Sequence, residues 1–171
     1  MFYLSKKTQI YFGVIPFTKD YEIAGELKYR EENGITILDI GNTIQGDKES
    51  VNIIESKYSF HTHPLNIYKK YGVNTGFPSV DDILSVIWCS ISFKSKFHIV
   101  VAVEGLYVLW CTNNIDTYDD NLHQYIMNNY NLCRYIDKTP YWFVDKINNM
   151  KNPIVKAKYI PKTEYQYRFL L

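Results

Sequence analysis

The sequence predicts an α/β fold in which a mixed β-sheet is flanked by helices and followed by a C-terminal helical extension. Three observations predict this fold class. Short segments rich in Ile, Val, Tyr and Phe recur through residues 8–110, as expected for strands. Residues 80–91 instead place their apolar side chains at helical spacing, and a more polar helical pattern follows residue 116. Strands combined with amphipathic helices are typical of α/β and α+β domains.

Four strands are expected before the first helix. Residues 8–17 mix strand formers with Gly and Pro and predict a strand and turn. Residues 22–30 and 35–40 predict a hairpin, because the pair Asn33-Gly34 between them is typical of a tight turn. A polar loop is expected from Gly41 to Ser50, and the fourth strand, residues 57–63, ends at Pro64.

The second half of the chain adds a helix and two more strands. The helix is predicted by a single apolar stripe, formed by Val80, Ile83, Leu84, Ile87, Trp88 and Ile91. Residues 97–103 and 106–110 predict a strand pair that turns at Glu104-Gly105. We expect a single domain over residues 1–171, with a core of about 8–112 and an extension of about 113–171.

The overall composition narrows the class of protein. Hydrophobic residues form 46% and charged residues 22% of the chain, which excludes a disordered or collagen-like protein. The 19 basic and 18 acidic residues leave a net charge of +1, so no nucleic-acid partner is expected. No apolar run reaches the roughly 20 residues that cross a bilayer, so no membrane partner is expected.

The expected location is intracellular and cytoplasmic. The first residues lack the apolar core of a signal peptide. The 3 cysteines contain no CxxC pattern, so a disulfide framework is not expected. Lys, Asn, Ile and Tyr, which have A/T-rich codons, are abundant, and this bias suits a large DNA virus. The location would then be the host cytoplasm or the virion.

The motif His61-Thr62-His63-Pro64 carries the strongest chemical signal. Alternate residues of a strand point to the same face, so both imidazoles can bind one ion. A catalytic Zn²⁺ takes three protein ligands and leaves a position for water. The third ligand can be Asp82, at the start of the predicted helix, with neighbouring Asp81 as the alternative.

The segment Pro78-Ser79-Val80-Asp81-Asp82 also has a purely structural interpretation. A Ser at the start of a helix, followed three residues later by an acid, resembles a capping box. Helix capping would account for Ser79 and Asp82 without catalysis, and the spacing leaves both interpretations open.

HxHP followed by PSxxD resembles the signature of the JAMM (MPN+/JAB) zinc metalloproteases, in which a Glu precedes these two motifs. Residues 21–27 resemble the E-x-x-G-x-L segment of that family. The resemblance covers about residues 8–112. It implies a JAB/MPN-like, cytidine-deaminase-like fold for this part of the chain.

The resemblance also implies a role for each matching residue. His61, His63 and Asp82 take the places of the Zn²⁺ ligands. Glu22 takes the place of the catalytic acid/base, with Glu26 as an alternative, and Ser79 takes the place of the Ser that stabilises the oxyanion. The family cleaves amides, usually isopeptide bonds that join ubiquitin or a ubiquitin-like protein to a lysine. Its members often need a companion subunit.

The chain departs from the family between the second His and the Ser, where residues 64–78 are longer than usual. We call residues 65–77 the insertion. It carries four large side chains, Tyr68, Lys69, Lys70 and Tyr71. We expect the insertion to overhang the metal and bind substrate, and a solvated surface loop is the alternative.

Two other functions stay open. A metal-free or inactive MPN-like domain could act as a scaffold or protein-interaction module, although every ligand type is present here. A different HxH hydrolase, acting on phosphoesters or small amides, would need further His and Asp ligands. His98, in an apolar strand, is expected to be a core or sheet-edge residue, and His123 is expected to face solvent.

Overall fold

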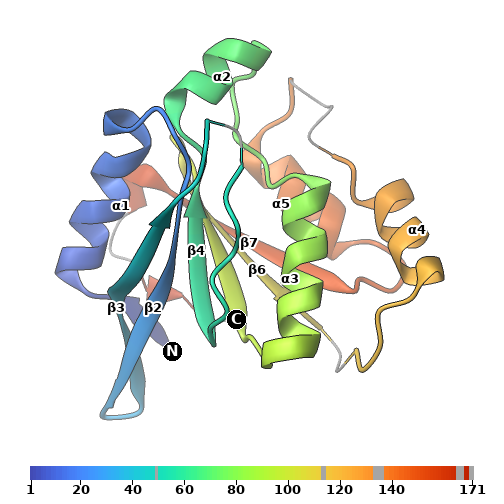
Figure 1. The fold of residues 1–171 in the computed structure, drawn as a ribbon, viewed down its shortest axis with the longest axis horizontal. Coiled ribbons are helices and arrows are strands. Elements are labelled where there is room, and N and C mark those ends of the chain that lie inside the picture. Colours follow the sequence, from blue (N-terminus) through green and yellow to red (C-terminus); the bar gives the residue numbers. More distant parts are fainter. Residues whose placement is uncertain (49, 113–114, 133–136, 165–167, 170–171) are drawn as a thin grey trace.

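The chain folds into a mixed sheet with helices on both faces (Figure 1). The computed structural model describes residues 1–171 except 49, 113–114, 133–136, 165–167 and 170–171. The elements are, in order, β1 (Phe2–Leu4), α1 (Lys6–Thr18), β2 (Ile23–Glu32), β3 (Ile35–Gln45), β4 (Tyr58–Thr62), α2 (Leu65–Tyr71), α3 (Val80–Phe93), β5 (Phe97–Val101), β6 (Gly105–Cys111), α4 (Asp120–Asn129), α5 (Pro140–Asn148), β7 (Val155–Pro161), the short 3₁₀ helix η1 (Lys162–Glu164) and β8 (Arg168–Phe169).

The sheet has eight strands in the order β7-β6-β5-β4-β2-β3-β1-β8. The pairs β4–β5 and β1–β3 are parallel, and the other neighbours are antiparallel. The HxH strand, β4, is therefore an interior strand, held between β2 and β5. The expected mixed α/β sheet flanked by helices is confirmed.

Two hydrophobic cores lie on opposite faces of the sheet. On one face, Phe12 of α1 packs against Phe60 of β4, with 4.9 Å between the ring centroids. On the other face, side chains of α3, α4 and α5 pack against β5, β6 and β7. Because side chains alternate along a strand, Ser59 and His61 face α3 while Phe60 faces α1.

The first element differs from the sequence prediction, because residues 8–17 lie in the helix α1 and not in a strand. The Ser5 side chain caps this helix by accepting a hydrogen bond from the backbone N–H of Thr8. Thr8, Phe12 and Ile15 are buried at helical spacing against the sheet. Their shared burial outweighs the strand-forming composition of the segment.

The C-terminal extension is not wholly helical, which is a second correction. The helices α4 and α5 form, but Val155–Pro161 forms β7 and pairs with β6 from Gly105 to Cys111. At the other end, β1 precedes the expected core and pairs with β3. The sheet therefore extends beyond residues 8–112 in both directions.

Three local predictions can be compared directly with the structure. The hairpin turn is confirmed, with φ of 51° at Asn33 and 76° at Gly34. The loop expected at 41–50 begins later, because β3 continues to Gln45. The insertion begins as a helix, α2, which ends at Gly72 with a positive φ of 63°.

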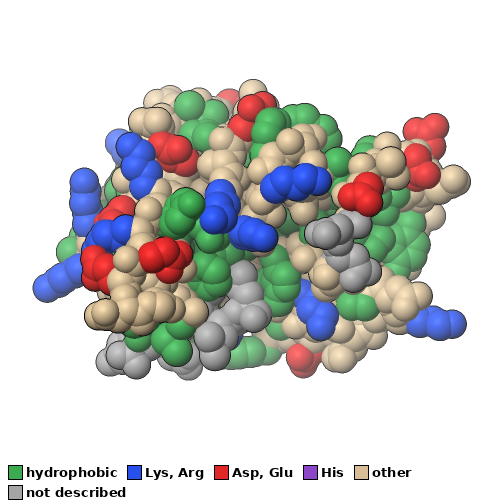
Figure 2. Space-filling model, turned by 90° about the horizontal axis from the view of Figure 1, so that it is seen from below, with side chains coloured by type: hydrophobic (Ala, Val, Ile, Leu, Met, Phe, Trp, Pro, Cys, Tyr) green, Lys and Arg blue, Asp and Glu red, His purple; other side chains and the backbone are tan. Residues whose placement is uncertain are grey.

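The side chains on one face, the helices and the described cysteines can each be compared with the sequence predictions. Figure 2, seen from below, shows basic, acidic and apolar side chains interspersed on that face. Within the described part of the chain, no helix combines the length and apolarity that a bilayer crossing needs. Cys89 and Cys111 are free thiols, and Cys133 lies outside the described residues.

Candidate metal centre

The structure brings His61, His63 and Asp82 together in one cluster. Each residue offers one ligand atom, and these atoms lie within 4.8 Å of one another. The two Nε2 atoms of the histidines are 3.0 Å apart. The carboxylate of Asp82 faces both rings, at 3.2 Å from Nε2 of His61 and 3.5 Å from Nε2 of His63. Asp81 is exposed and lies outside this cluster.

The remaining ring nitrogens support this arrangement. The Nδ1 atom of His61 lies 2.6 Å from Nε2 of His98, and that of His63 lies 3.1 Å from the carbonyl oxygen of Gly76. Metal-bound histidines usually make such a contact through the nitrogen that does not bind the metal. Two imidazoles and one carboxylate, with both Nε2 atoms turned inward, fit Zn²⁺ with one position left open.

The capping box expected from the sequence is present at the start of α3. The Oγ atom of Ser79 accepts a hydrogen bond of 3.1 Å from the backbone N–H of Asp82. In return, Oδ2 of Asp82 accepts one of 2.6 Å from the backbone N–H of Ser79. Because Oδ1 still faces His61, capping and metal binding are compatible, and capping fixes the carboxylate toward the histidines.

The pKa values show how the cluster holds a proton when no ion is bound. Burial by itself would lower the pKa of His63, but the hydrogen bond and the charge of Asp82 raise it to about 9. Burial would raise the pKa of Asp82, yet His61 and His63 hold it well below its usual range. A divalent cation has to displace this proton, so ion binding is coupled to proton release.

Glu22 is buried beside the cluster, immediately before β2, and is 5% exposed. Its backbone N–H donates to the carbonyl of Asp47 at 2.7 Å. The next residue, Ile23, donates its N–H to the hydroxyl of Thr62, which lies between the two histidines, at 2.9 Å. Burial raises the pKa of Glu22, and the histidines partly oppose this effect. These bonds hold the backbone at Glu22 beside β4, and the buried carboxyl group is close enough to the histidines for their charges to affect its pKa.

The E-x-x-G-x-L segment has a packing reason for its glycine. Gly25 pairs with Phe60 on β4, and a Cβ atom at Gly25 would overlap the Phe60 ring. Glycine thus allows β2 to approach the strand that carries the histidines. The alternative base, Glu26, instead accepts a hydrogen bond from the backbone N–H of Asn42 at 3.1 Å, on the side of β3.

A cleft of about 590 Å³ opens over the cluster. Its polar wall includes Glu22, His63, Ser79, Asp81 and Asp82. Its apolar wall comes from the loop after β3 and from the insertion, through Val51, Ile53, Ile67, Tyr71, Val73 and Phe77. The insertion therefore borders the cleft, and Val51 and Ile53 are wall residues that the sequence analysis missed.

The four large side chains of the insertion have different positions. Tyr71 lines the cleft, and its substrate-binding role stays a prediction. Tyr68 is 6% exposed and its hydroxyl donates to Glu104 at 2.6 Å, so its role is structural. Lys69 and Lys70 lie exposed in the last turn of α2, outside the described lining of the cleft.

The insertion is attached to the turn between β5 and β6 through Glu104. The Oε1 atom of Glu104 accepts a hydrogen bond of 2.8 Å from the backbone N–H of Gly76. The carbonyl of the same residue, Gly76, faces His63. A Cβ atom at Gly76 would overlap the hydroxyl of Tyr68. The insertion therefore supplies the hydrogen-bond partner of one candidate ligand, besides bordering the cleft.

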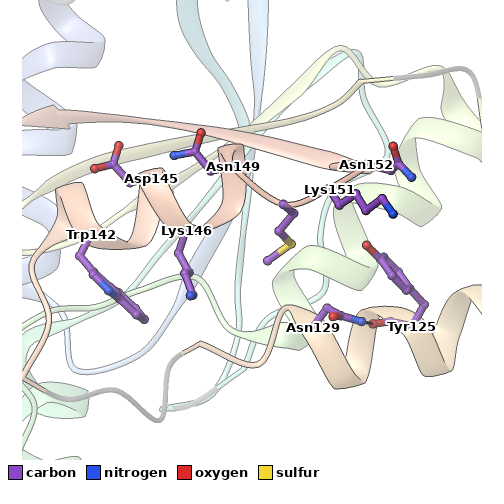
Figure 3. A pocket seen from close by; sticks show the side chains of 9 residues that line it. Tyr125, Asn129, Trp142, Asp145, Lys146, Asn149, Lys151 and Asn152 are labelled. Carbon is purple, nitrogen blue, oxygen red and sulfur yellow. Dashed lines mark hydrogen bonds between the residues drawn. The ribbon is translucent and has the colours of Figure 1, made fainter.

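A second cavity, of about 680 Å³, lies elsewhere (Figure 3). Tyr125 and Asn129 of α4 border it on one side, and Trp142 and Lys146 of α5 lie on another. Its described lining contains none of the candidate metal ligands.

The exposed His123 bonds Tyr118 at 2.6 Å, and its solvent-facing position is as expected.

Comparisons with known proteins give a viral relative and no family assignment. No protein-family model matches the chain, and no solved structure matches it. The chain is 34% identical over 76 residues to "Uncharacterized protein 3R" of Frog virus 3 (isolate Goorha). The match covers 44% of this chain and 16% of the relative, so the chain spans only a small part of that protein's length. The similarity to a viral protein agrees with the viral source expected from the composition.

Proposed function

We propose that this chain is a zinc-dependent peptidase or isopeptidase of JAMM type that cleaves ubiquitin or ubiquitin-like conjugates. One observation carries the proposal: the cluster of His61, His63 and Asp82 borders, through His63 and Asp82, the same cleft as Glu22. A ligand set with an adjacent acid is what a zinc-assisted hydrolysis requires. The order of the motifs along the chain, with Glu first, then HxHP and then PSxxD, gives independent support.

Each side chain of the cleft has a chemical task in this proposal. Zn²⁺ in such a site acts as a Lewis acid that polarises a carbonyl and makes water acidic enough to react at neutral pH. The carboxylate of Glu22 accepts the proton of the attacking water and passes it to the leaving nitrogen. The raised pKa of Glu22 suits both steps, because the group can hold the proton between them.

In this proposal, Ser79 stabilises the developing negative charge on the carbonyl oxygen. Its Oγ atom accepts a hydrogen bond from the N–H of Asp82, which orients the hydroxyl and leaves its proton for an acceptor in the cleft. Donors fixed in this way before the reaction stabilise an oxyanion without reorganisation.

The substrate and the location belong to the same proposal. A protein tail lying in the cleft would contact the apolar wall formed by Val51, Ile53 and Tyr71 as well as the acids at its floor. We propose an intracellular, cytoplasmic site of action, in the host cell or the virion, with a companion subunit as a possible further partner.

The test compares Glu22→Gln with Glu26→Gln, which is a matched change on the neighbouring acid. Glu22→Gln should retain zinc but lower cleavage of a ubiquitin-type isopeptide substrate by at least about 10²-fold, since it removes the proton acceptor. Glu26→Gln should cleave like the wild type, because Glu26 is bonded on the side of β3. Elemental analysis should find about one Zn²⁺ per chain. A wild-type protein that stays metal-free after zinc-replete purification would contradict the proposal and favour the scaffold alternative.

A further inference from the structure

We propose that His98, on β5, is a positioning residue that fixes the candidate ligand His61 so that Nε2 of His61 faces the metal; this inference rests on the proposed zinc site. Nothing in the HxHP or PSxxD motifs assigns a role to His98, which lies on a different strand. The sequence alone favoured a core histidine.

The geometry is a continuous chain of polar contacts beneath the cluster. Ser59 and His61 lie on β4 and both face α3, as does His98 on the adjacent parallel strand β5, where it pairs with Ser59. The Oγ atom of Ser59 is 2.7 Å from Nδ1 of His98, and Nε2 of His98 is 2.6 Å from Nδ1 of His61. The rings of His61 and His98 are stacked, with 4.9 Å between their centroids.

Complete burial makes these contacts obligatory. Ser59 is 1% exposed, and His61 and His98 are each 2% exposed. A buried polar group that loses its partner pays a desolvation penalty, so every nitrogen in this chain requires its neighbour. The contacts therefore determine the ring orientations and are not incidental to packing.

The positions of the protons follow from the requirement at the metal. A neutral His61 whose Nε2 is free to bind Zn²⁺ carries its proton on Nδ1 and donates it to Nε2 of His98. His98 then carries its own proton on Nδ1 and donates it to the hydroxyl of Ser59.

The tautomer of His63 is fixed by a backbone carbonyl, that of Gly76. A carbonyl can only accept, so it dictates the tautomer by itself. A histidine and a hydroxyl can each donate or accept, so His98 and Ser59 take up the proton arrangement that a metal at Nε2 of His61 requires. The role assigned to His98 therefore includes Ser59.

The experiment measures Zn²⁺ affinity by chelator competition in the full chain carrying single substitutions. His98→Phe keeps a ring but removes the acceptor, and should weaken Zn²⁺ binding by about 10–100-fold. His98→Gln restores an acceptor near the former Nε2 position and should bind within about tenfold of the wild type. Leu109→Ala is the control. Leu109 lies on β6, is fully buried and pairs with His98 of β5, but it is not a member of the polar chain. It should reduce stability and leave Zn²⁺ affinity near the wild-type value.

A second measurement needs no variant and is insensitive to general destabilisation. Long-range ¹H–¹⁵N spectra of the zinc-loaded wild type should place the proton of His98 on Nδ1 and that of His61 on Nδ1. A proton on Nε2 of His98, or equal Zn²⁺ affinity in His98→Phe and the wild type, would overturn the inference and leave the zinc site intact. A wild type that binds no zinc would overturn the proposed function together with the inference.

Discussion

The two histidines of the cluster are held by different parts of the molecule. His61 is supported by side chains of the sheet, Ser59 and His98, which lie on adjacent interior strands. His63 is supported by a backbone carbonyl of the insertion, at Gly76, which in turn is held by Glu104. We call these the sheet-held half and the insertion-held half of the site.

Because Gly76 contacts His63, the insertion is part of the candidate metal centre as well as of the cleft wall. Hydrogen bonds along β4 and β5 fix the sheet-held half in register. The insertion-held half depends on a loop between two helices, which is anchored by Glu104 and by the close contact of Gly76 with Tyr68. Side chains on strands are held more precisely than groups on loops, so the insertion-held half is the more adjustable one.

The largest effect is expected from Asp82, because its carboxylate faces both halves. Asp82→Ala removes a candidate ligand and one partner of the capping box. Zn²⁺ binding should therefore weaken by more than the roughly 100-fold expected at most when only a hydrogen-bond partner of a ligand is lost. Asp81→Ala is the matched control, since Asp81 is exposed and outside the cluster. Chelator competition on both variants measures the difference. Equal losses in the two variants would show that Asp82 is not a ligand.

A smaller effect is expected when only the insertion-held half is disturbed. Gly76→Ala places a methyl group against the hydroxyl of Tyr68 and should displace the carbonyl that faces His63. We expect a loss of about 10-fold or more in Zn²⁺ affinity, as is usual when a metal ligand loses its hydrogen-bond partner. Asn74→Ala, an exposed position of the same segment, should have no effect.

The outcome for Gly76→Ala separates two roles of the insertion. Unchanged Zn²⁺ affinity combined with a raised KM would restrict the insertion to substrate binding, which is what the sequence alone predicted. Lower affinity in Gly76→Ala but not in Asn74→Ala would show that the insertion supports the metal.

The candidate ligands could be predicted from the sequence because their spacing is local. His61 lies in β4 and His63 follows its last residue, Thr62, and Ser79 and Asp82 have the spacing of a helix start. The role of His98 could not be predicted in this way. It depends on the parallel register of β4 and β5, which pairs His98 with Ser59 and is not visible in a single sequence.

The fold was predictable where periodicity was clear. The stripe of α3 and the Asn33-Gly34 turn were both informative. The helix α1 was missed because strand-forming residues obscured the helical spacing of Thr8, Phe12 and Ile15. The strand β7 was missed although Val155 and Ala157 are buried and the residues between and after them are lysines, which is an alternating pattern.

The last effect expected is a pH dependence of stability that belongs to the insertion-held half of the metal-free protein. The pKa of His63 is raised from the usual 6.5 to about 9 in the folded chain, mainly by Asp82 acting against burial. The folded state therefore holds this proton more tightly than the unfolded state does. The resulting stabilisation is fully present below about pH 6.5 and is lost as the pH rises through about 9.

Thermal melts of the chelator-treated protein between pH 6 and 9.5 measure this contribution. Tm should fall across the upper part of this range, by about 2–4 °C for each kcal/mol lost in a chain of this size. His63→Gln removes the titrating group and should flatten the profile, and zinc-loaded protein should also be flat, because the cation replaces the proton. An equally steep fall of Tm in His63→Gln would assign the pH dependence to other groups. A steeper fall of Tm in the wild type than in His63→Gln would show that His63 carries the proton that the metal displaces. His63 belongs to the insertion-held half of the site.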